Sequence, residues 1–260
     1  MYDLPALDSA LAGTIFAGQL HFSASTGSTN DDAKTAAQDG AAHGSVFFAD
    51  EQTAGRGRGD HAWHSAAGEG LYASVLLRPS IPLHRLTLAP LSAGLAAAHA
   101  IRTTTGLAVD LRWPNDLLLG PRKTGGILVE AGKHSEEPPH AVVGIGINVH
   151  QRSFAPGLAT PATSLDIASG RVISRQALLI ALLQSLQQEF EVLVDPQAAL
   201  AIPRHAEQSS TWMRDRRVEV HGPQLCTGIT DGLDEHGFLR VRTANGLVTV
   251  QTGGLRDAVI

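Results

Sequence analysis

The feature of this sequence that most restricts its fold is a short run of alternating glycine and arginine between two apolar segments. Three glycines, Gly55, Gly57 and Gly59, occupy every second position, with Arg56 and Arg58 between them. Glycine lets the main chain approach a ligand closely and point successive N–H groups at it. Arginine adds a fixed fork of donors for carboxylate or phosphate. In a chain whose net charge is -5, this positive loop predicts an anion-binding site.

Segments rich in glycine and arginine also occur in disordered regions that contact nucleic acid. Here the run is short, and it is followed by Trp63 and by the apolar residues 71–77, which are typical of a core strand. An ordered loop held between two strands therefore fits this segment better than a flexible linker does.

The length and composition are those of a globular protein with a sizeable core. The 260 residues are 43% hydrophobic and 17% charged, enough for one large domain or a medium and a small one. A pI of 6.2 gives no support for general binding to nucleic acid or membranes. The single cysteine, Cys226, fits a reducing compartment. No Lys or Arg precedes Lys34, and the apolar run 177–183 is too short to cross a bilayer. We therefore expect a cytoplasmic protein.

Apolar periodicity predicts a mixed α/β core over residues 1–207. Strands are expected at 19–22, 45–49, 71–77, 122–130 and 141–149, with the last two joined as a hairpin, and an extended run at 109–119 is broken by Pro114. Helices are expected at 3–13, 28–38, 86–104, 175–194 and between 196 and 205, and residues 152–170 are expected to be irregular.

The residue pattern of the sequence changes near residues 206–213. Short strand-like segments follow at 217–221, 225–229, 238–242 and 247–251, separated by turn residues. Asn245-Gly246 is a strong signal for a hairpin. Residues 211–260 are therefore predicted to form a small barrel domain.

Polar residues stand at strand ends and breaks, where binding groups concentrate. Ser28 and Thr29 either cap a helix or offer hydroxyls to a ligand, and the Asn115-Asp116 pair is either a turn or a site. Lys123 is either a solvated edge lysine or a group beside a ligand that the following glycines admit. Several cations converging on one place would imply a multiply anionic substrate or two anions held together.

Other chemistries fit less well. His61, His64 and Glu69 would share a face only in a helix, which Gly59 and Gly68 oppose, and one cysteine gives no thiolate cluster. The sequence has no Gly-x-Ser-x-Gly elbow, its lysine precedes the glycines instead of following one as in a P-loop, and it lacks a dinucleotide fingerprint. We therefore expect no metal held by protein side chains.

Five blocks, in order over residues 26–148, resemble the motifs of biotin protein ligases. The blocks are Thr26-Gly-Ser-Thr-Asn, Gln52-Thr-Ala-Gly-Arg-Gly-Arg, Arg112-Trp-Pro-Asn-Asp, Lys123-Thr-Gly-Gly-Ile-Leu-Val-Glu and Gly144-Ile-Gly-Ile-Asn.

The resemblance implies an α+β fold: an SH2-like, class II synthetase-like catalytic core with a mixed sheet flanked by helices, and an SH3-like C-terminal barrel. It implies that ATP and biotin form biotinyl-5'-adenylate, with Mg²⁺ accompanying ATP. The biotinyl group then passes to one lysine of a biotin carboxyl carrier protein. Because the first block begins at Thr26, we expect a monofunctional ligase without the N-terminal DNA-binding domain, no membrane partner and a possible homodimer.

The resemblance also implies roles for individual residues. Catalytic roles are expected for Arg58, Lys123 and Asp116. Contacts to biotin are expected for Ser28, Thr29, Asn30, Gln52, Gly55, Arg56, Gly57, Arg58, Lys123 and Gly126. Contacts to ATP or the adenylate are expected for Arg56, Trp63, Asn115, Asp116 and Asn148.

Two departures and two rivals accompany this interpretation. The C-terminal stretch Thr252-Gly-Gly-Leu-Arg only loosely matches the family, so no ATP contact is expected from it. Gly59-Asp60 stands where many relatives carry a basic or small residue and glycine, which predicts a looser hold on the adenylate. A lipoate or octanoate ligase or transferase shares the superfamily, and the Gly-Arg-Gly-Arg and Trp-Pro-Asn-Asp blocks count against it. A non-catalytic biotin- or nucleotide-binding regulator is the rival of another class, and intact Arg58 and Lys123 count against it.

Overall fold

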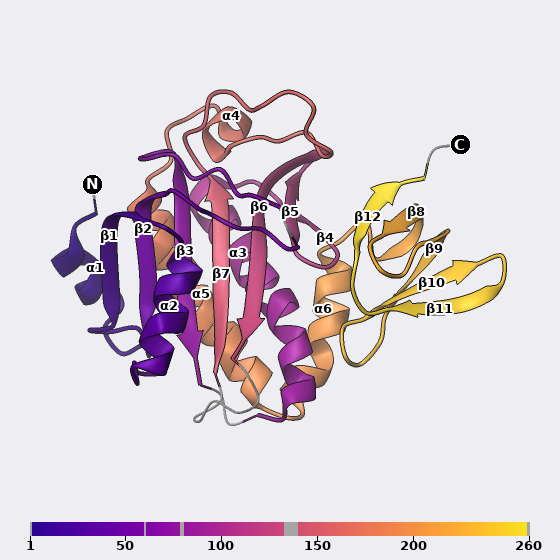
Figure 1. The fold of residues 1–260 in the computed structure, drawn as a ribbon, viewed down its shortest axis with the longest axis horizontal. Helices are drawn as coiled ribbons and strands as arrows, with labels where there is room; N and C mark the ends of the chain where they lie inside the picture. Colours follow the sequence, from indigo (N-terminus) through magenta and orange to yellow (C-terminus); the bar gives the residue numbers. More distant parts are fainter. Residues whose placement is uncertain (1, 60, 79–80, 133–139, 259–260) are drawn as a thin grey trace.

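A computed structural model describes residues 2–59, 61–78, 81–132 and 140–258 (Figure 1). Its larger part is built on a seven-stranded sheet in the order β1-β2-β3-β7-β6-β5-β4. β1 and β2 run parallel, and every other neighbouring pair is antiparallel. The strands are β1 Leu20–Thr26, β2 Val46–Gln52, β3 Gly70–Leu77, β4 Asp110–Arg112, β5 Asp116–Leu119, β6 Arg122–Ala131 and β7 Ala141–Asn148.

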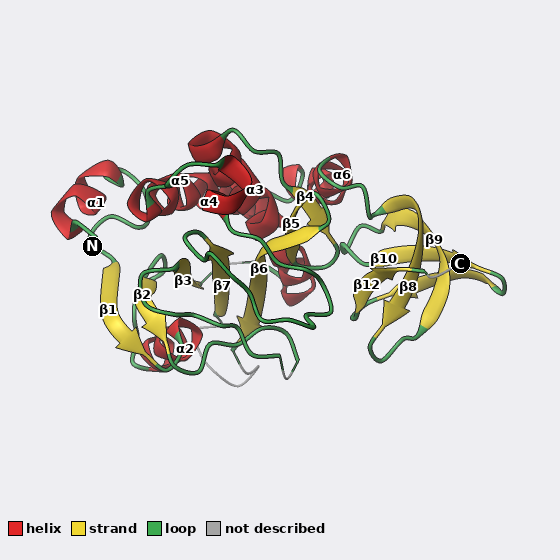
Figure 2. Ribbon diagram, turned by 90° about the horizontal axis from the view of Figure 1, so that it is seen from above, coloured by secondary structure: helices red, strands yellow, loops and turns green. Residues whose placement is uncertain are grey.

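Helices cover the two faces of this sheet unequally (Figure 2). On one face lie α1 Leu4–Ala10, α3 Ala89–Thr105, α5 Arg175–Val194 and α6 Ile202–Gln208, while α2 Thr29–Gln38 lies on the other. α4 Leu165–Ser169 sits in the loop above the strands in Figure 1, and short 3-10 turns at Leu83–Leu88 and Ala198–Ala201 precede α3 and α6.

Alternation along the strands sorts the core between the two faces. On β7, Val143, Ile145 and Ile147 belong to the main core under α3 and α5, whereas Val142 joins a small cluster with Ala33 and Ala37 of α2. β3 is buried at every position because both of its faces are covered. The face toward α2 thus has little apolar cover, which leaves room on it for a site.

By length and composition alone, α5 would be able to cross a membrane. Its apolar side chains instead form the core: Leu178, Leu182 and Leu186 are fully buried, and the helix packs along α3. Its start is the one expected, because Ser174 accepts a hydrogen bond from the Ala177 N–H as an N-cap.

The C-terminal part is a five-stranded antiparallel sheet, here called the C-terminal sheet, in the order β11-β10-β9-β8-β12. Its strands are β8 Arg214–His221, β9 Cys226–Leu233, β10 Leu239–Thr243, β11 Gly246–Val250 and β12 Gly254–Asp257. The hairpin expected at Asn245-Gly246 joins β10 to β11, with Ala244 and Asn245 in the turn and Gly246, at a positive φ of 112°, paired with Thr243 as the first residue of β11.

The C-terminal sheet is bound to the core by contacts between distant residues. The Trp113 indole N–H donates to the Gly237 carbonyl at 3.0 Å, and the Leu233 N–H donates to a Glu207 carboxylate oxygen at 2.6 Å. The Thr87 hydroxyl adds a hydrogen bond of 2.8 Å to the His236 carbonyl. These bonds fix the loop between β9 and β10 against the start of α3.

The expected mixed α/β fold is confirmed, with small differences. Residues 152–170 are not wholly irregular, because Ser164 caps α4, a helix of five residues that is too short to show periodicity. β12 was not expected, since its four residues are too few for a strand pattern and are held by pairing with β8. The turn between β6 and β7, 133–139, lies outside the described residues, and the domain limits at 207 and 211 stay a prediction.

Candidate functional site

A strip of glycine forms the floor of the site on the sheet face toward α2. Gly126 of β6 pairs with Gly146 of β7, and Gly144 follows on the same face of β7. A Cβ at Gly146 would come within 2.7 Å of the Trp63 indole ring, and one at Gly144 would collide with the Asn30 amide. The strip therefore lets Trp63 and Asn30 lie directly on the strands.

A chain of hydroxyls and amides forms the wall beside this floor. The Thr29 N–H donates to the Gln52 amide oxygen at 2.9 Å, and the Thr29 hydroxyl lies 2.7 Å from that of Ser74. The Ser74 hydroxyl in turn donates to the Asn30 amide oxygen at 2.5 Å. Each hydroxyl has one proton, so when Ser74 donates to Asn30 the Thr29 hydroxyl can donate either to Ser74 or to the Gln52 amide oxygen, which lies 3.0 Å away. The wall is thus a connected set of hydrogen bonds in which the Thr29 proton has two acceptors.

Glu130 orients the end of that wall. Its carboxylate accepts hydrogen bonds from the Asn30 amide at 2.7 Å and from Lys34 at 3.0 Å, and Arg56 lies at 3.5 Å. Burial alone would raise the pKa of Glu130, but Asn30 and Lys34 outweigh it and hold the pKa below its ordinary value. An ionised Glu130 requires the NH₂ of Asn30 to point at it, which turns the amide oxygen toward Ser74.

Arg56 forms an ion pair with Asp31. Its guanidinium makes two hydrogen bonds to the Asp31 carboxylate, at 2.7 and 2.8 Å. Lys34 lies 2.9 Å from the same carboxylate. Two parallel N–H to oxygen bonds fix the geometry of the pair. Arg56 thus ties the glycine-arginine loop to the first turn of α2.

Lys123 and Asp116 meet at the other end of the floor. The Lys123 ammonium lies 2.5 Å from the Asp116 carboxylate and 5.5 Å from the centroid of the Trp63 ring. Arg112 binds the other Asp116 oxygen at 2.6 Å. Burial alone would raise the pKa of Asp116, but Lys123 and Arg112 outweigh it and hold the pKa below its ordinary value. Asp116 is therefore an anion between two cations, one of which, Arg112, is almost wholly buried.

Trp63 spans the space between the glycine floor and Lys123. Its ring rests over Gly146, and its buried indole N–H has no hydrogen-bond partner among the described residues. A buried donor without a partner is costly. Trp63 thus offers both a flat apolar face and an unused N–H to a ligand.

The loop that carries Arg58 folds back on itself. Arg56 pairs with Ala62 in an isolated bridge, and the Gly57 N–H donates to the His61 carbonyl at 2.7 Å. A Cβ at Gly55 would lie 2.5 Å from the Trp63 carbonyl oxygen, so glycine is required there by the packing of the loop itself. Asp60, at which a looser hold on the ligand was expected, lies outside the described residues.

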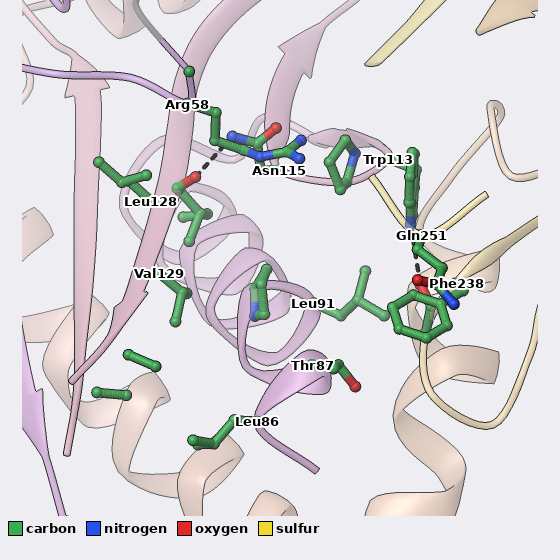
Figure 3. A pocket seen from close by; sticks show the side chains of 17 residues that line it. Arg58, Leu86, Thr87, Leu91, Trp113, Asn115, Leu128, Val129, Phe238 and Gln251 are labelled. Carbon is green, nitrogen blue, oxygen red and sulfur yellow. Dashed lines mark hydrogen bonds between the residues drawn. The ribbon is translucent and has the colours of Figure 1, made fainter. Parts of the chain in front are cut away.

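A groove of about 580 Å³ opens where the core meets the C-terminal sheet (Figure 3). Arg58 and Asn115 lie together at one side of it, and Leu91, Phe238 and Gln251 lie further along it. The amide N–H of Asn115, the residue just before β5, donates to the Ile127 carbonyl at 2.7 Å. That bond leaves the amide oxygen of Asn115 as the atom available to a ligand.

The remaining expected residues lie around the same face. Ser28 occupies the N-cap position of α2, but its side chain makes no capping hydrogen bond. The interpretation of Ser28 as only a cap is therefore wrong. Asn148, at the end of β7, donates from its amide to the Thr163 carbonyl at 3.1 Å. The structure thus gathers the expected residues at one sheet face and its edge, while their contacts with ligands stay predictions.

Sequence reasoning missed Glu130, Arg112, Ser74 and two residues of the C-terminal sheet. Counting every second residue from Gly126 along β6 would have placed Glu130 on the floor side. No comparable local pattern marks Thr252 and Gly253. They accept hydrogen bonds from Arg58 at 2.9 and 2.8 Å, although they lie 194 and 195 residues further along the chain. Among the described residues, no three His, Cys, Asp or Glu side chains form a group that would hold a metal ion.

Comparison with known proteins agrees with this geometry. Residues 22–148 match the biotin/lipoate A/B protein ligase family. The bifunctional ligase/repressor BirA of Bacillus spizizenii is 33% identical over 235 residues, which cover 88% of this chain and 70% of that protein. The biotin–[acetyl-CoA-carboxylase] ligase of Mycobacterium tuberculosis is 33% identical over 241 residues, 90% of this chain and 87% of the relative.

A solved structure shares the whole architecture. The biotin protein ligase from Aquifex aeolicus, in complex with biotin and ATP, superimposes with a TM-score of 0.80 at 28% identity, covering 92% of this chain and 99% of that one. The family match includes the glycine-arginine loop, the Asn115-Asp116 pair and Lys123. The chain therefore belongs to the biotin protein ligases of the biotin/lipoate A/B protein ligase family.

Proposed function

We propose that this protein activates biotin with ATP as biotinyl-5'-adenylate and transfers the biotinyl group to a lysine of a biotin carboxyl carrier protein. The observation that carries the proposal is the placement of two cationic side chains around Asp116: Lys123 contacts its carboxylate, and the charge of Asp116 also acts on Arg58. Lys123 lies beside the glycine floor, and Arg58 lies at the groove with Asn115. A site with this charge suits two anions held side by side, as the biotin carboxylate and the α-phosphate of ATP must be.

The wall and the floor would receive biotin. Thr29, Asn30 and Gln52 present a fixed set of donors and acceptors, and Ser28 has a hydroxyl not used in capping. The ureido group of biotin needs such an arrangement, because it carries one acceptor and two donors. The glycine floor admits the fused rings close to the strands, since a side chain on Gly126 would narrow the space beside Lys123.

The residues at the edge of the sheet would receive the nucleotide. Trp63 offers its ring face and unused indole N–H, and Asn115 and Asn148 offer amide groups. Mg²⁺ would reach the site on the phosphates of ATP and keep mostly water ligands. The assignment of Arg56 to either ligand would require the pair with Asp31 to open, or would use its main chain alone.

The chemistry depends on charge and position. The two anions repel each other in water, and Lys123 and Arg58 would hold them in contact and stabilise the negative charge that grows in the transition state. Lys123 would have to leave Asp116 to do so. Asp116 would then keep Arg112 as its partner, so that no buried carboxylate is left uncompensated.

Asp116 would also be the group nearest to an incoming lysine. A carboxylate whose pKa is held below its ordinary value is a weak base. It would become a better proton acceptor once Lys123 has moved to the adenylate. The expected role of Asp116 as a base is therefore tied to that change of partner.

Release of pyrophosphate tests the activity and separates it from its rivals. With ATP and biotin the protein should release pyrophosphate, and with lipoate or octanoate it should release none. Radiolabelled biotin should then pass to a carrier domain and not to the same domain with its acceptor lysine replaced by arginine. Turnover with lipoate alone would support the lipoate ligase, and none with any acid would support a regulator.

The remaining expectations concern partners and place. We infer a cytoplasmic enzyme, in keeping with the single cysteine, Cys226. A homodimer, the absence of DNA binding and the monofunctional type stay predictions. Sedimentation with and without biotin and ATP would decide the first of these.

A further inference from the structure

The guanidinium of Arg58 is bound to the C-terminal sheet. It donates to the Gly253 carbonyl oxygen at 2.8 Å and to the Thr252 hydroxyl at 2.9 Å, in the link between β11 and β12. These partners lie 195 and 194 residues further along the chain. The tip of the glycine-arginine loop is therefore docked on a different sheet from the one that forms the floor of the site.

Both acceptors are neutral. Among the described residues, no carboxylate lies within ion-pair distance of Arg58, although the charge of Asp116 acts on it from further away. Burial lowers the pKa of the guanidinium, and Asp116 offsets part of that effect. The docked arginine thus keeps a net positive charge that an anion in the groove would meet.

The backbone of the C-terminal sheet is shaped to present these acceptors. Gly253 has a φ of 148°, which side-chain-bearing residues rarely adopt, and a Cβ there would lie 2.7 Å from the His221 carbonyl oxygen. Pairing of Gly254 with His221 begins β12 directly afterwards. The carbonyl that receives Arg58 is therefore held in place by a glycine and by the edge of β8.

We propose that Thr252 is a positioning residue for adenylate formation, because its hydroxyl and the adjoining Gly253 carbonyl hold Arg58 at the groove where the nucleotide phosphates bind. This inference rests on the proposed function for its substrate. The same link places Gln251 in the groove that Arg58 and Gly59 also line. The C-terminal sheet then contributes to the activation of biotin by orienting a cation of the core, without touching the reacting atoms itself.

The consequence should appear in the use of ATP. Arg58 lines the groove together with Asn115, a residue that the proposed function assigns to the nucleotide. Loosening Arg58 should therefore raise the KM for ATP. Loss of one hydrogen bond to a charged group corresponds to a change of about ten-fold.

The experiment compares three variants of the full chain. Thr252→Val removes the hydroxyl at constant shape, Thr252→Ser restores it, and Thr249→Val makes the same change at an exposed threonine on β11 that does not bind Arg58. Trypsin cleavage after Arg58, followed by mass spectrometry without substrates, reports how often the loop undocks. Cleavage after Arg56, which Asp31 holds, is the internal reference.

Thr252→Val should be cleaved after Arg58 about ten-fold faster than the wild type, with the KM for ATP raised by a similar factor. Thr252→Ser and Thr249→Val should behave as the wild type does. Unchanged cleavage of Thr252→Val would show that the hydroxyl does not hold Arg58. Faster cleavage with an unchanged KM for ATP would show that the contact holds the loop but does not position Arg58 for adenylate formation. Either result overturns the proposal.

A second pair of variants tests the carbonyl. Gly253→Ala should shift it and free Arg58, whereas Gly246→Ala meets the same strain of a positive φ in open space, far from the loop. Equal trypsin cleavage in these two would also contradict the proposal. The trypsin assay needs no turnover, so a protein that releases no pyrophosphate would defeat the proposed function and leave the docking of Arg58 testable.

Discussion

At the residue scale, Lys123 and Arg58 are bound in different ways before substrate arrives. Lys123 is paired with a carboxylate, Asp116, whereas Arg58 has only neutral acceptors within hydrogen-bond distance in the described part of the chain. Lys123 must exchange one anion for another, and Arg58 can accept an anion without losing one. In the proposed reaction, both changes would place positive charge where negative charge grows.

Replacing either cation should stop adenylate formation without unfolding the protein. We expect Lys123→Ala and Arg58→Ala to lower the single-turnover rate of adenylate formation about a hundred-fold or more, as removal of one stabilising donor does. Rapid quenching with labelled ATP measures this rate. Arg122→Ala, at the exposed neighbour of Lys123, is the matched control and should leave the rate unchanged. Unchanged rates in the first two variants would remove both residues from the mechanism.

Arg56 should hold the glycine-arginine loop in place against α2. Because it is bound to Asp31 through two hydrogen bonds, Arg56→Ala and Asp31→Ala should weaken biotin binding to similar extents. The double variant should be no weaker than either single one, since the pair acts as a unit. Calorimetry of biotin binding measures the three affinities. Additive losses would instead mean that Arg56 contacts the ligand independently of Asp31.

At the element scale, the floor of the site depends on glycines of β7 and β6 that face α2. Gly146 and Gly126 pair across the two strands, yet a methyl group has different consequences at the two positions. At Gly146 it would meet the Trp63 ring at 2.7 Å, whereas at Gly126 its nearest neighbours lie at 3.5 Å or more.

Gly146→Ala should therefore displace Trp63 from the sheet. Overpacking of this kind costs about 1–3 kcal/mol, so the free energy of unfolding should fall by that amount, with a shift in tryptophan fluorescence. Gly126→Ala should have the same free energy of unfolding and the same tryptophan fluorescence as the wild type. Its affinity for biotin should fall if Gly126 contacts the ligand. Denaturant titration followed by fluorescence measures both. Equal stability of the two variants would contradict the packing of Trp63 on β7.

Helix α5 carries a carboxyl group whose titration should be visible in the stability of the protein. Burial raises the pKa of Glu189 from 4.5 to about 7. A raised pKa in the folded state means that folding favours the protonated form, so stability is complete below pH 4.5, falls as the pH rises from 4.5 to about 7, and levels off above that. Glu189→Gln should match the wild-type melting temperature near pH 4 and exceed it at pH 8. Identical melting temperatures at pH 8 would show that Glu189 is solvated.

The helices and most strands could be predicted from the sequence because each rests on a local pattern. Ser174 capped α5 as expected, and Asn245-Gly246 formed its hairpin. β12 could not be predicted, because its four residues are too few to show a strand pattern and form a strand only through their pairing with β8. The same reason hid Thr252 from sequence analysis: its contact with Arg58 depends on how the C-terminal sheet sits against the core.

At the scale of the whole molecule, the site is assembled from parts that are far apart in the chain. The α2 start provides the hydroxyl wall, β6 and β7 the floor, and the β4–β5 turn the Asn115-Asp116 pair. The C-terminal sheet holds Arg58. Each part except the last matches a sequence block, and the fold brings these parts to one sheet face and its edge.

A crystal structure with biotin and a non-hydrolysable ATP analogue tests the central claim most directly. The account predicts that the Lys123 ammonium leaves Asp116 and lies within hydrogen-bond distance of the biotin carboxylate, with Asp116 still bound to Arg112. It also predicts the Arg58 guanidinium beside the α-phosphate. Finding Lys123 still on Asp116, with both cations remote from the carboxylate and the phosphate, would contradict it.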